Sequence, residues 1–239
     1  MDKIEKALAE LKTLIRAHAD AGMAHMQSCE GLFTGKDLVT SMMLNRSVNL
    51  LDGFAVMIER KNLVTAGPLV RIQLDNCLRF FALTLVENPN RVAERVIFGE
   101  RLNALHARDG KQLSDAYLTK KFSKRFPWCR KLYNDGSGEV HLSQRHFGHA
   151  FKVKNKQQGV LGVKIGVGDE NVPEEAYVRT VQTFAEITRT LLLLVKEDIV
   201  RREAAYAASK AEASRRARSG EVIPMPPPPD TGAELSPGG

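Results

Sequence analysis

Apolar residues recur at helical spacing through most of this chain. In the first such stretch, Ile4, Leu8 and Leu11 fall on one face of a helix, the face that a helix buries against its neighbours. The stretches with this spacing are residues 2–29, 37–61, 69–85, 91–108 and 173–200. Aromatic residues make up only 6% of the chain, which suits a core of Leu, Ala and Val between helices. The sequence therefore predicts a mainly all-α fold, a helical bundle.

Helix-breaking residues predict where these helices begin and end. Asp37 is placed to cap the second helix, and Pro68 suits the first position of the third. The pair 109–110, Asp and Gly, predicts the end of the fourth helix. Between 113 and 130 the pattern indicates short helical pieces, and the Gly-bearing run 133–138 indicates turns.

Residues 151–167 change from helical spacing to the alternation typical of strands. Phe151 and Val153 form one alternating run, and Val163 and Ile165 form another. We therefore expect a β-hairpin inserted in the helical bundle.

The long C-terminal helix predicts self-association. From Glu174 to Arg216 the chain keeps helix-forming residues for about 43 positions, which span about 65 Å if fully helical. The apolar stripe ends near residue 200, and a helix that leaves its own core usually packs on a partner. We therefore expect a homodimer to which this helix contributes. The expected parts are a bundle domain over 1–200, a helical extension over 201–219, and a disordered Pro/Gly-rich tail over 220–239.

The composition points to a cytoplasmic protein without a membrane partner. The chain is charged from Asp2 onward, unlike a secretory signal, and its longest apolar run covers only residues 191–195. Three widely spaced cysteines form no C-x-x-C pair, which favours a reducing compartment over a disulfide framework or a cysteine-based zinc site.

Nearly all of the positive charge lies in one segment. Residues 111–164 hold 12 Lys and Arg against 3 Asp and Glu, and the whole chain has a net charge of +7. A basic segment on a near-neutral body is typical of a site for a phosphate-rich partner, and the alternative is a solvated basic face.

Within that segment, one run combines cations with aromatic residues. The candidate phosphate-binding residues are Lys120, Lys121, Lys124, Arg125, Arg130 and Lys131. Phe122, Phe126 and Trp128 lie between them and could stack on bases, but anchoring to the core is the favoured role for at least two of the three.

Two helices carry polar residues that predict a polar cleft. Arg71, Asp75 and Arg79 share one face of the third helix, as a structural ion network or as one wall of a polar site. The second helix carries a stripe that could face them, with Arg46 beside it. The stripe consists of Asn45, Asn49 and Asp52, and Tyr133 and Ser137 are further candidates for this cleft.

Histidines and arginines that could move protons or stabilise phosphoryl charge follow the basic run. The candidates for catalysis are His141, Arg145 and His149, with Arg71 as a second arginine. The alternative is that these histidines are hydrogen-bonded structural residues with no catalytic role. We expect no metal site and no cofactor, because the spacing of the histidines matches no metal motif and no nucleotide-binding glycine loop is present.

The order of two core helices bearing Arg, Asn and Asp, followed by Tyr133-x3-Ser137-x3-His141, resembles a group of bacterial helical proteins similar to the HEPN (higher eukaryotes and prokaryotes nucleotide-binding) superfamily. The resemblance covers about residues 40–195. It implies a helical bundle, often dimeric, that acts as a metal-independent RNase in toxin or antiviral defence systems. The HEPN motif is Arg, a polar residue, three to five further residues and then His. The chain departs from it, because only two residues separate the polar residue after Arg145 from His149.

The sequence thus predicts a nucleic-acid-binding helical protein, with RNA favoured over DNA, and cleavage by a metal-independent endoribonuclease as the finer expectation. The alternative is a non-catalytic interaction module whose basic face binds an acidic protein.

Overall fold

The computed structural model describes residues 2–140, 150–155, 157, 159–166, 168, 169 and 172–219. The helices are α1 (Lys3–Ser28), α2 (Gly35–Glu59), α3 (Leu63–Ala82), α4 (Pro89–Ile97), the 3₁₀ turn η1 (Leu102–Ala104), α5 (Asp115–Phe122), α6 (Trp128–Val140) and α8 (Glu174–Ser219). The strands are β1 (Phe151–Asn155) and β2 (Val160–Val163). The fold is mainly α-helical, with a small pair of strands and a long C-terminal helix, which confirms the predicted fold class.

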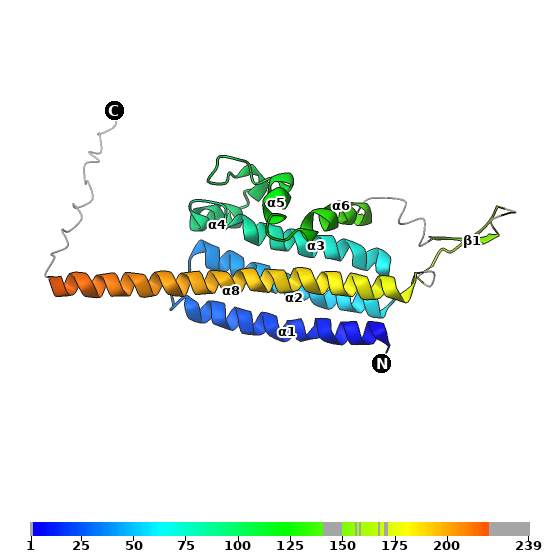
Figure 1. Cartoon of the computed structure of the whole chain (residues 1–239), viewed down its shortest axis with the longest axis horizontal. Helices are drawn as coiled ribbons and strands as arrows, with labels where there is room; N and C mark the ends of the chain where they lie inside the picture. Colours follow the sequence, from blue (N-terminus) through cyan, green and yellow to red (C-terminus); the bar gives the residue numbers. More distant parts are fainter. Residues whose placement is uncertain are drawn as a thin grey trace, which may run out of the picture. The chain divides into compact units, whose positions relative to one another are not determined.

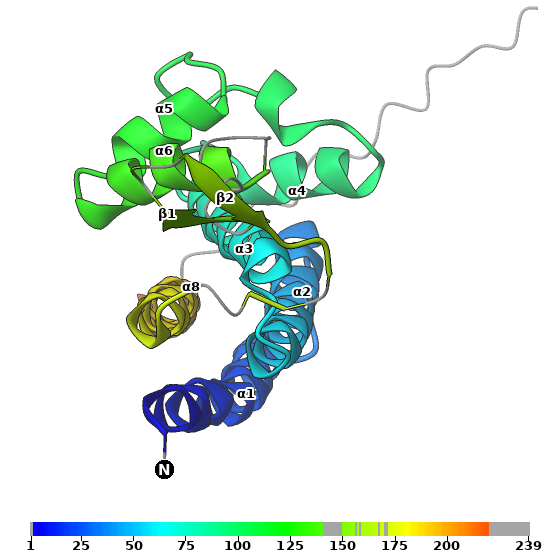
Figure 2. The ribbon, with the colours of Figure 1, turned by 90° about the vertical axis from the view of Figure 1, so that its right-hand side faces the viewer.

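Contacts between residues divide the chain into two units, Met1–Val200 and Arg201–Gly239. In the first unit, α1, α2 and α3 form a curved layer, and the first part of α8 lies against it (Figures 1 and 2). The ring of Phe54 on α2 stacks on that of Phe184 on α8, with centroids 4.2 Å apart. The predicted stripe of α8 is fully buried: Tyr177, Val181, Phe184, Ile187, Leu191 and Leu194.

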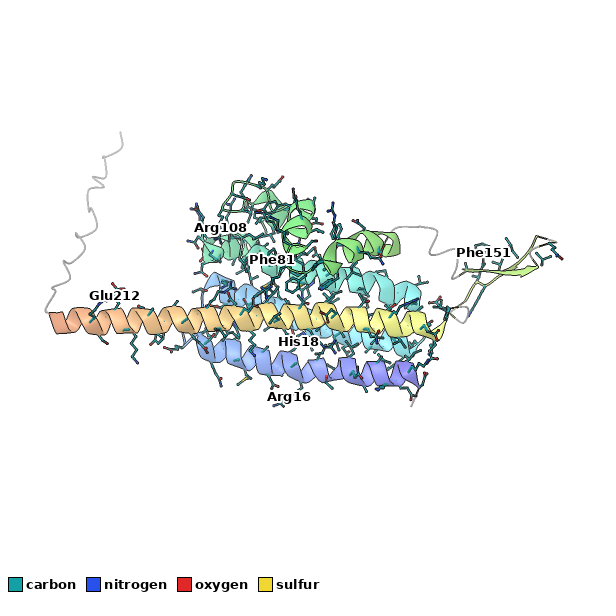
Figure 3. The ribbon with its side chains drawn as sticks, viewed as in Figure 1. Arg16, His18, Phe81, Arg108, Phe151 and Glu212 are labelled. Carbon is teal, nitrogen blue, oxygen red and sulfur yellow. The ribbon has the colours of Figure 1, made fainter. Side chains whose placement is uncertain are left out.

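A line of polar side chains crosses this apolar core. His18 of α1 lies with Nε2 2.8 Å from the hydroxyl of Ser47, and Gln73 donates to Ser47 (2.6 Å) and to Thr188 of α8 (3.0 Å). Figure 3 shows His18 pointing from α1 toward the bundle, whereas Arg16 points away from it. Burial lowers the pKa of His18, so the imidazole is neutral at physiological pH.

Helices α4, α5 and α6 cover α3 on the side away from α1 (Figure 2). Phe122 of α5 is fully buried and contacts Phe81, Phe126 and Trp128, with ring centroids 5.1, 4.6 and 6.1 Å away. The aromatic residues of the basic run therefore anchor α5 and α6 to the bundle.

The third helix begins earlier than predicted. Pro68 lies inside α3, which starts at Leu63 and is capped by the side chain of Asn62. A carboxylate oxygen of Asp169 also accepts from the backbone N–H groups of Leu63 (2.6 Å) and Val64 (3.2 Å). Because these two caps satisfy the first free donors, the helix starts one and a half turns before the proline.

Three other predictions about the helices were wrong. α4 ends at Ile97, followed by Gly99 with a positive φ of 95°, so the helix does not reach residue 108. The run 133–138 is not a set of turns but part of α6, where Gly136 lets the helix approach α3 closely. The second helix is capped by Thr34, and Asp37 completes its capping box instead of being the cap itself.

The β-hairpin is confirmed. β1 and β2 pair antiparallel, with Phe151 opposite Val163 and an irregularity between Val153 and Asn155. The expected tail after residue 220 lies outside the described residues. Among those described, no helix has the length and apolar character needed to cross a bilayer.

Candidate functional site

The predicted polar residues of α3 belong to an ion network that joins α3, α5 and α6. Arg79 pairs with Asp75 one turn away (3.0 Å) and with Asp115 of α5. Arg71 lies 3.7 Å from the same Asp115 carboxylate, and its guanidinium covers the ring of Tyr133 at 4.1 Å. The Tyr133 hydroxyl donates to Asp115 (3.1 Å). One carboxylate of α5 thus gathers two arginines of α3 and a tyrosine of α6.

Within the network, two arginines of α3 face two carboxylates, and Arg46 of α2 adds a third cation 3.9 Å from Asp75. Burial disfavours the charged form of Arg79, but Asp75 and Asp115 outweigh this effect and raise the pKa of the guanidinium. Burial raises the pKa of Tyr133 as well, with Arg71 opposing the shift and Asp115 adding to it. The side chain of Arg71 is 15% exposed, so little of it is accessible to a phosphate group. The arrangement supports the first of the two roles expected for these charges, a structural ion network.

The stripe on α2 lies mostly apart from this network. Asn45, Asn49 and Asp52 are exposed, and Asn49 donates to the backbone carbonyl of Asn45 (2.8 Å). Asn45 and Arg46 line a cavity of about 450 Å³ between α2, α3 and α4, together with Arg79. Asn49 and Asp52 are not part of its lining.

Four of the six predicted phosphate-binding residues are exposed cations with no ion pair among the described residues. They are Lys120, Lys124, Arg130 and Lys131. Over the ranges of chain that the structure describes, none of the four forms an ion pair. These cations lie at the end of α5, in the α5–α6 connection and in the first turn of α6. Their charge is therefore available to a partner.

The other two are paired within the protein. Lys121 binds Asp109 at 3.0 Å, a hydrogen bond that raises the pKa of the lysine. Arg125 makes a bidentate pair with Glu197 of α8, in which one bond measures 2.8 Å. This pair raises the pKa of Arg125 and fixes the α5–α6 connection to α8.

A second cavity extends the basic surface toward α8. It has a volume of about 420 Å³ and lies between α3, α6 and α8, and its lining includes Lys131 and Arg179, one acidic residue, Asp135, and the threonines Thr180 and Thr183. Arg179 is exposed and, like Lys131, has no ion pair in the described ranges. The sequence gives no signal for Arg179, Thr180 and Thr183, because they lie off the apolar stripe of a long helix and form no motif. Only the packing of α6 and of α8 on α3 brings them beside the basic run.

Three candidate catalytic residues, His141, Arg145 and His149, lie outside the described residues. Ser137 falls within α6, one turn after Tyr133, but its side chain lies outside the described part as well. Of the proposed catalytic set, only Arg71 has a described environment, and that environment is the ion network.

No family model matches the chain, and neither the curated proteins nor the solved structures include a significant match.

Proposed function

We propose that this chain is a helical nucleic-acid-binding protein that contacts the phosphate backbone through the surface around α5, α6 and the start of α8. The observation that carries the proposal is the cavity lined by Lys131 and Arg179, next to the exposed cations of the α5–α6 connection. A volume of about 420 Å³ falls within the range of small-ligand sites, which includes sites for a single nucleotide.

The surroundings of this surface favour contacts to phosphates over contacts to bases. Phe122, Phe126 and Trp128 pack against one another, so they are engaged in the core. Without stacking side chains, binding depends on the lysines and arginines and varies little with sequence. The resemblance to HEPN proteins favours RNA over DNA.

The salt dependence of RNA binding tests this proposal. We would measure the affinity of the full chain for a single-stranded RNA by fluorescence anisotropy, from about 50 to 200 mM salt. The test variant, K120Q/K124Q/K131Q/R179Q, removes four cations of the proposed surface. The control variant, K3Q/K6Q/R60Q/K196Q, removes four equally exposed cations elsewhere on the protein.

For a single strand, each phosphate that a cation of the protein neutralises contributes about −0.7 to the slope of log affinity against log salt concentration. The test variant should therefore bind with a slope shallower by about 3, while the control keeps the parental slope. Equal losses in the two variants would show a non-specific effect of net charge. A parent that binds no RNA at low salt would contradict the proposal and leave the alternative, an acidic protein partner.

Cleavage of the bound RNA is the finer part of the proposal, supported by the sequence pattern alone. An electrophoretic assay with EDTA present should show products that disappear in His141→Ala, while binding persists. RNA that stays intact with the parent protein would reduce the proposal to binding without catalysis.

We also propose that the protein is a homodimer that associates through the second unit. Its helical part, Arg201–Ser219, carries exposed side chains at nearly every described position, including Tyr206 at 52% exposure. Light scattering should give the mass of a dimer for the full chain and of a monomer for a chain ending at Val200. A monomeric full chain at tens of micromolar would contradict this.

A further inference from the structure

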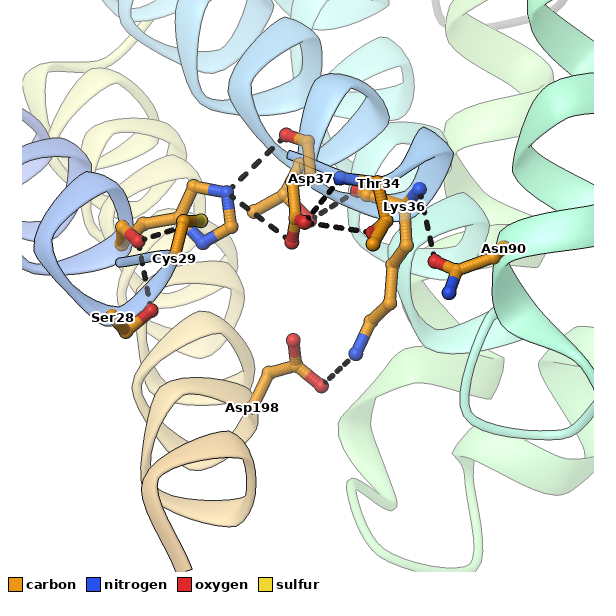
Figure 4. Close-up of polar contacts among 9 residues, drawn as sticks. Ser28, Cys29, Thr34, Lys36, Asp37, Asn90 and Asp198 are labelled. Carbon is orange, nitrogen blue, oxygen red and sulfur yellow. Dashed lines mark hydrogen bonds and ion pairs between the residues drawn. The ribbon is translucent and has the colours of Figure 1, made fainter. Parts of the chain in front are cut away.

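Three side chains with metal-binding atoms meet in the interior where α1 ends and α2 begins. His25, Cys29 and Asp37 are 2%, 4% and 0% exposed, and each offers one ligand atom within 4.8 Å of the others. Figure 4 shows this region, with Cys29 at the end of α1 and Asp37 in the first turn of α2. The spacing of the cysteines and of the histidines after residue 140 predicts no metal site, and these three residues do not belong to either pattern.

The local structure explains why these residues meet. His25 and Cys29 are four residues apart at the end of α1, so both side chains fall on the same helical face. The short connection to Thr34 turns the chain back, and Asp37 lies in the first turn of α2. A sequence signal existed: His-x3-Cys at the end of a predicted helix, followed by Asp in the next.

The carboxylate of Asp37 is held in one orientation by its own helix. Its Oδ2 accepts from the backbone N–H of Thr34 (2.8 Å) and from the Thr34 hydroxyl (2.7 Å). Its Oδ1 lies 3.9 Å from Nε2 of His25. Hydrogen bonds of this kind, behind a ligand atom, are what orients the ligands in metal sites.

The three ligand atoms, which lie within 4.8 Å of one another, must draw closer to hold a tetrahedral ion. Zinc binds nitrogen, oxygen and sulfur at about 2.0–2.3 Å, so two ligand atoms on a tetrahedral ion lie about 3.4 Å apart. The 3.9 Å between Nε2 of His25 and Oδ1 of Asp37 exceeds this by about half an ångström. To bind the ion, Nε2 would also leave the backbone carbonyl of Asp37 (3.2 Å) and the Cys29 thiol would leave the carbonyl of His25 (3.2 Å).

The charges also favour a divalent cation. A thiolate at Cys29 and the carboxylate of Asp37 carry two negative charges, which a divalent ion neutralises in an interior where charges need partners. The neighbouring cation, Lys36, is paired with Asp198 of α8 at 2.5 Å, which balances its repulsion toward a bound metal.

We propose that His25, Cys29 and Asp37 form a zinc-binding site that fastens the end of α1 to the start of α2. Mixed nitrogen, sulfur and oxygen donors select zinc or another late transition metal over magnesium or calcium. Three protein ligands leave the fourth position of a tetrahedral ion for a water molecule. This site is independent of the proposed nucleic-acid surface.

Cobalt, which replaces zinc and is coloured, tests the site directly. Titration of the metal-free full chain with Co²⁺ should produce the visible bands of a four-coordinate ion and the near-ultraviolet charge-transfer band of a cobalt–thiolate bond, saturating at one equivalent. Zinc should then displace the cobalt. Both signals should be lost in Cys29→Ser and weakened in Asp37→Asn.

Two matched variants identify the cysteine and exclude the three histidines after residue 140, His141, His146 and His149. Cys77 and Cys129 are also buried, and burial raises the pKa of Cys129 to about 11, so both remain thiols. The variant C77A/C129A retains only Cys29 and should keep the charge-transfer band. The variant H141Q/H146Q/H149Q should keep it as well.

Thermal unfolding gives a readout that does not depend on colour. Zinc at 100 times its Kd should raise the Tm of the parent by about 5–10 °C. The Tm of Cys29→Ser should not change with zinc. If this variant does not fold, the band of C77A/C129A still decides the question. Absence of a cobalt–thiolate band in the parent, or its loss in C77A/C129A with the fold intact, would overturn the proposal.

Discussion

Replacing Gly136 by alanine should destabilise the protein although alanine is the better helix former. A Cβ atom at this position of α6 would lie 3.2 Å from Cδ and 3.3 Å from Cβ of Arg71. The Arg71 side chain cannot move aside freely, because it covers the ring of Tyr133 and faces Asp115. The added methyl group must therefore push α6 away from α3 or distort the ion network.

The magnitude follows from two opposing effects. A Gly to Ala change inside a helix stabilises by about 1 kcal/mol, and overpacking a close contact costs about 1–3 kcal/mol. Gly53 of α2 supplies the matched control, because a Cβ there would meet nothing within 4 Å. Gly53→Ala should gain about 1 kcal/mol, and Gly136→Ala should fall below it by about 1–3 kcal/mol.

Urea denaturation followed by circular dichroism measures both variants, with equal m-values required for the comparison. The difference corresponds to about 2–4 °C in Tm for each kcal/mol. If Gly136→Ala stabilises as much as Gly53→Ala, the close contact of α6 with α3 does not exist in solution. In an Arg71→Ala background the penalty at Gly136 should shrink, which a double-mutant cycle would show.

Three further predictions follow from the polar contacts. Because burial lowers the pKa of His18, the unfolded chain binds the proton first as the pH falls. The contribution of His18 to stability should therefore be complete above the unfolded pKa of 6.5 and should be lost as the pH drops below it. In urea melts from about pH 5 to 8, the free energy of unfolding should depend less on pH for His18→Gln than for the parent. Asp169→Ala should cost about 0.5–2 kcal/mol and speed hydrogen exchange at the amide of Leu63, whereas an unchanged exchange rate would refute the cap. Asp115→Asn should cost about 1–3 kcal/mol in urea melts, because Arg79 loses a charged acceptor; a neutral result would mean that the pair contributes nothing.

The parts of the fold that the sequence predicts are those fixed by local pattern. The stripe of α8 from Tyr177 to Leu194 is visible in the sequence because a buried helix face repeats every three to four residues. The start of α3 is not visible, since one of its caps comes from Asp169, 106 residues from Leu63. Gly136 predicts a turn by propensity, and only the packing against Arg71 makes a glycine favourable inside a helix there.

In the candidate site, too, the sequence predicts the residues placed by local helical spacing and not those placed by packing between helices. Helical spacing places Arg71, Asp75 and Arg79 on one face of α3, and the structure has them in one network. The partner that joins them, Asp115, has no sequence signal, because it reaches them from a different helix. The same holds for Arg179, which lines one cavity with Lys131 because α6 and α8 both pack against α3.

The cap that Asp169 provides has a consequence for the order of events during synthesis. The first turn of α3 lacks one of its caps until the ribosome has added the following 106 residues, which takes about 5–20 s at bacterial and eukaryotic rates. During that interval the emerging bundle has a frayed α3 whose N-terminal amides exchange with solvent. The contacts that fix the start of α3 therefore form late, when α8 packs on the bundle. At that point Asp169 accepts from the amides of Leu63 and Val64, and the Tyr177 hydroxyl donates to the carbonyl of Lys61. Nascent chains that stop before residue 169 should therefore be more sensitive to proteases at the α2–α3 turn than the completed protein.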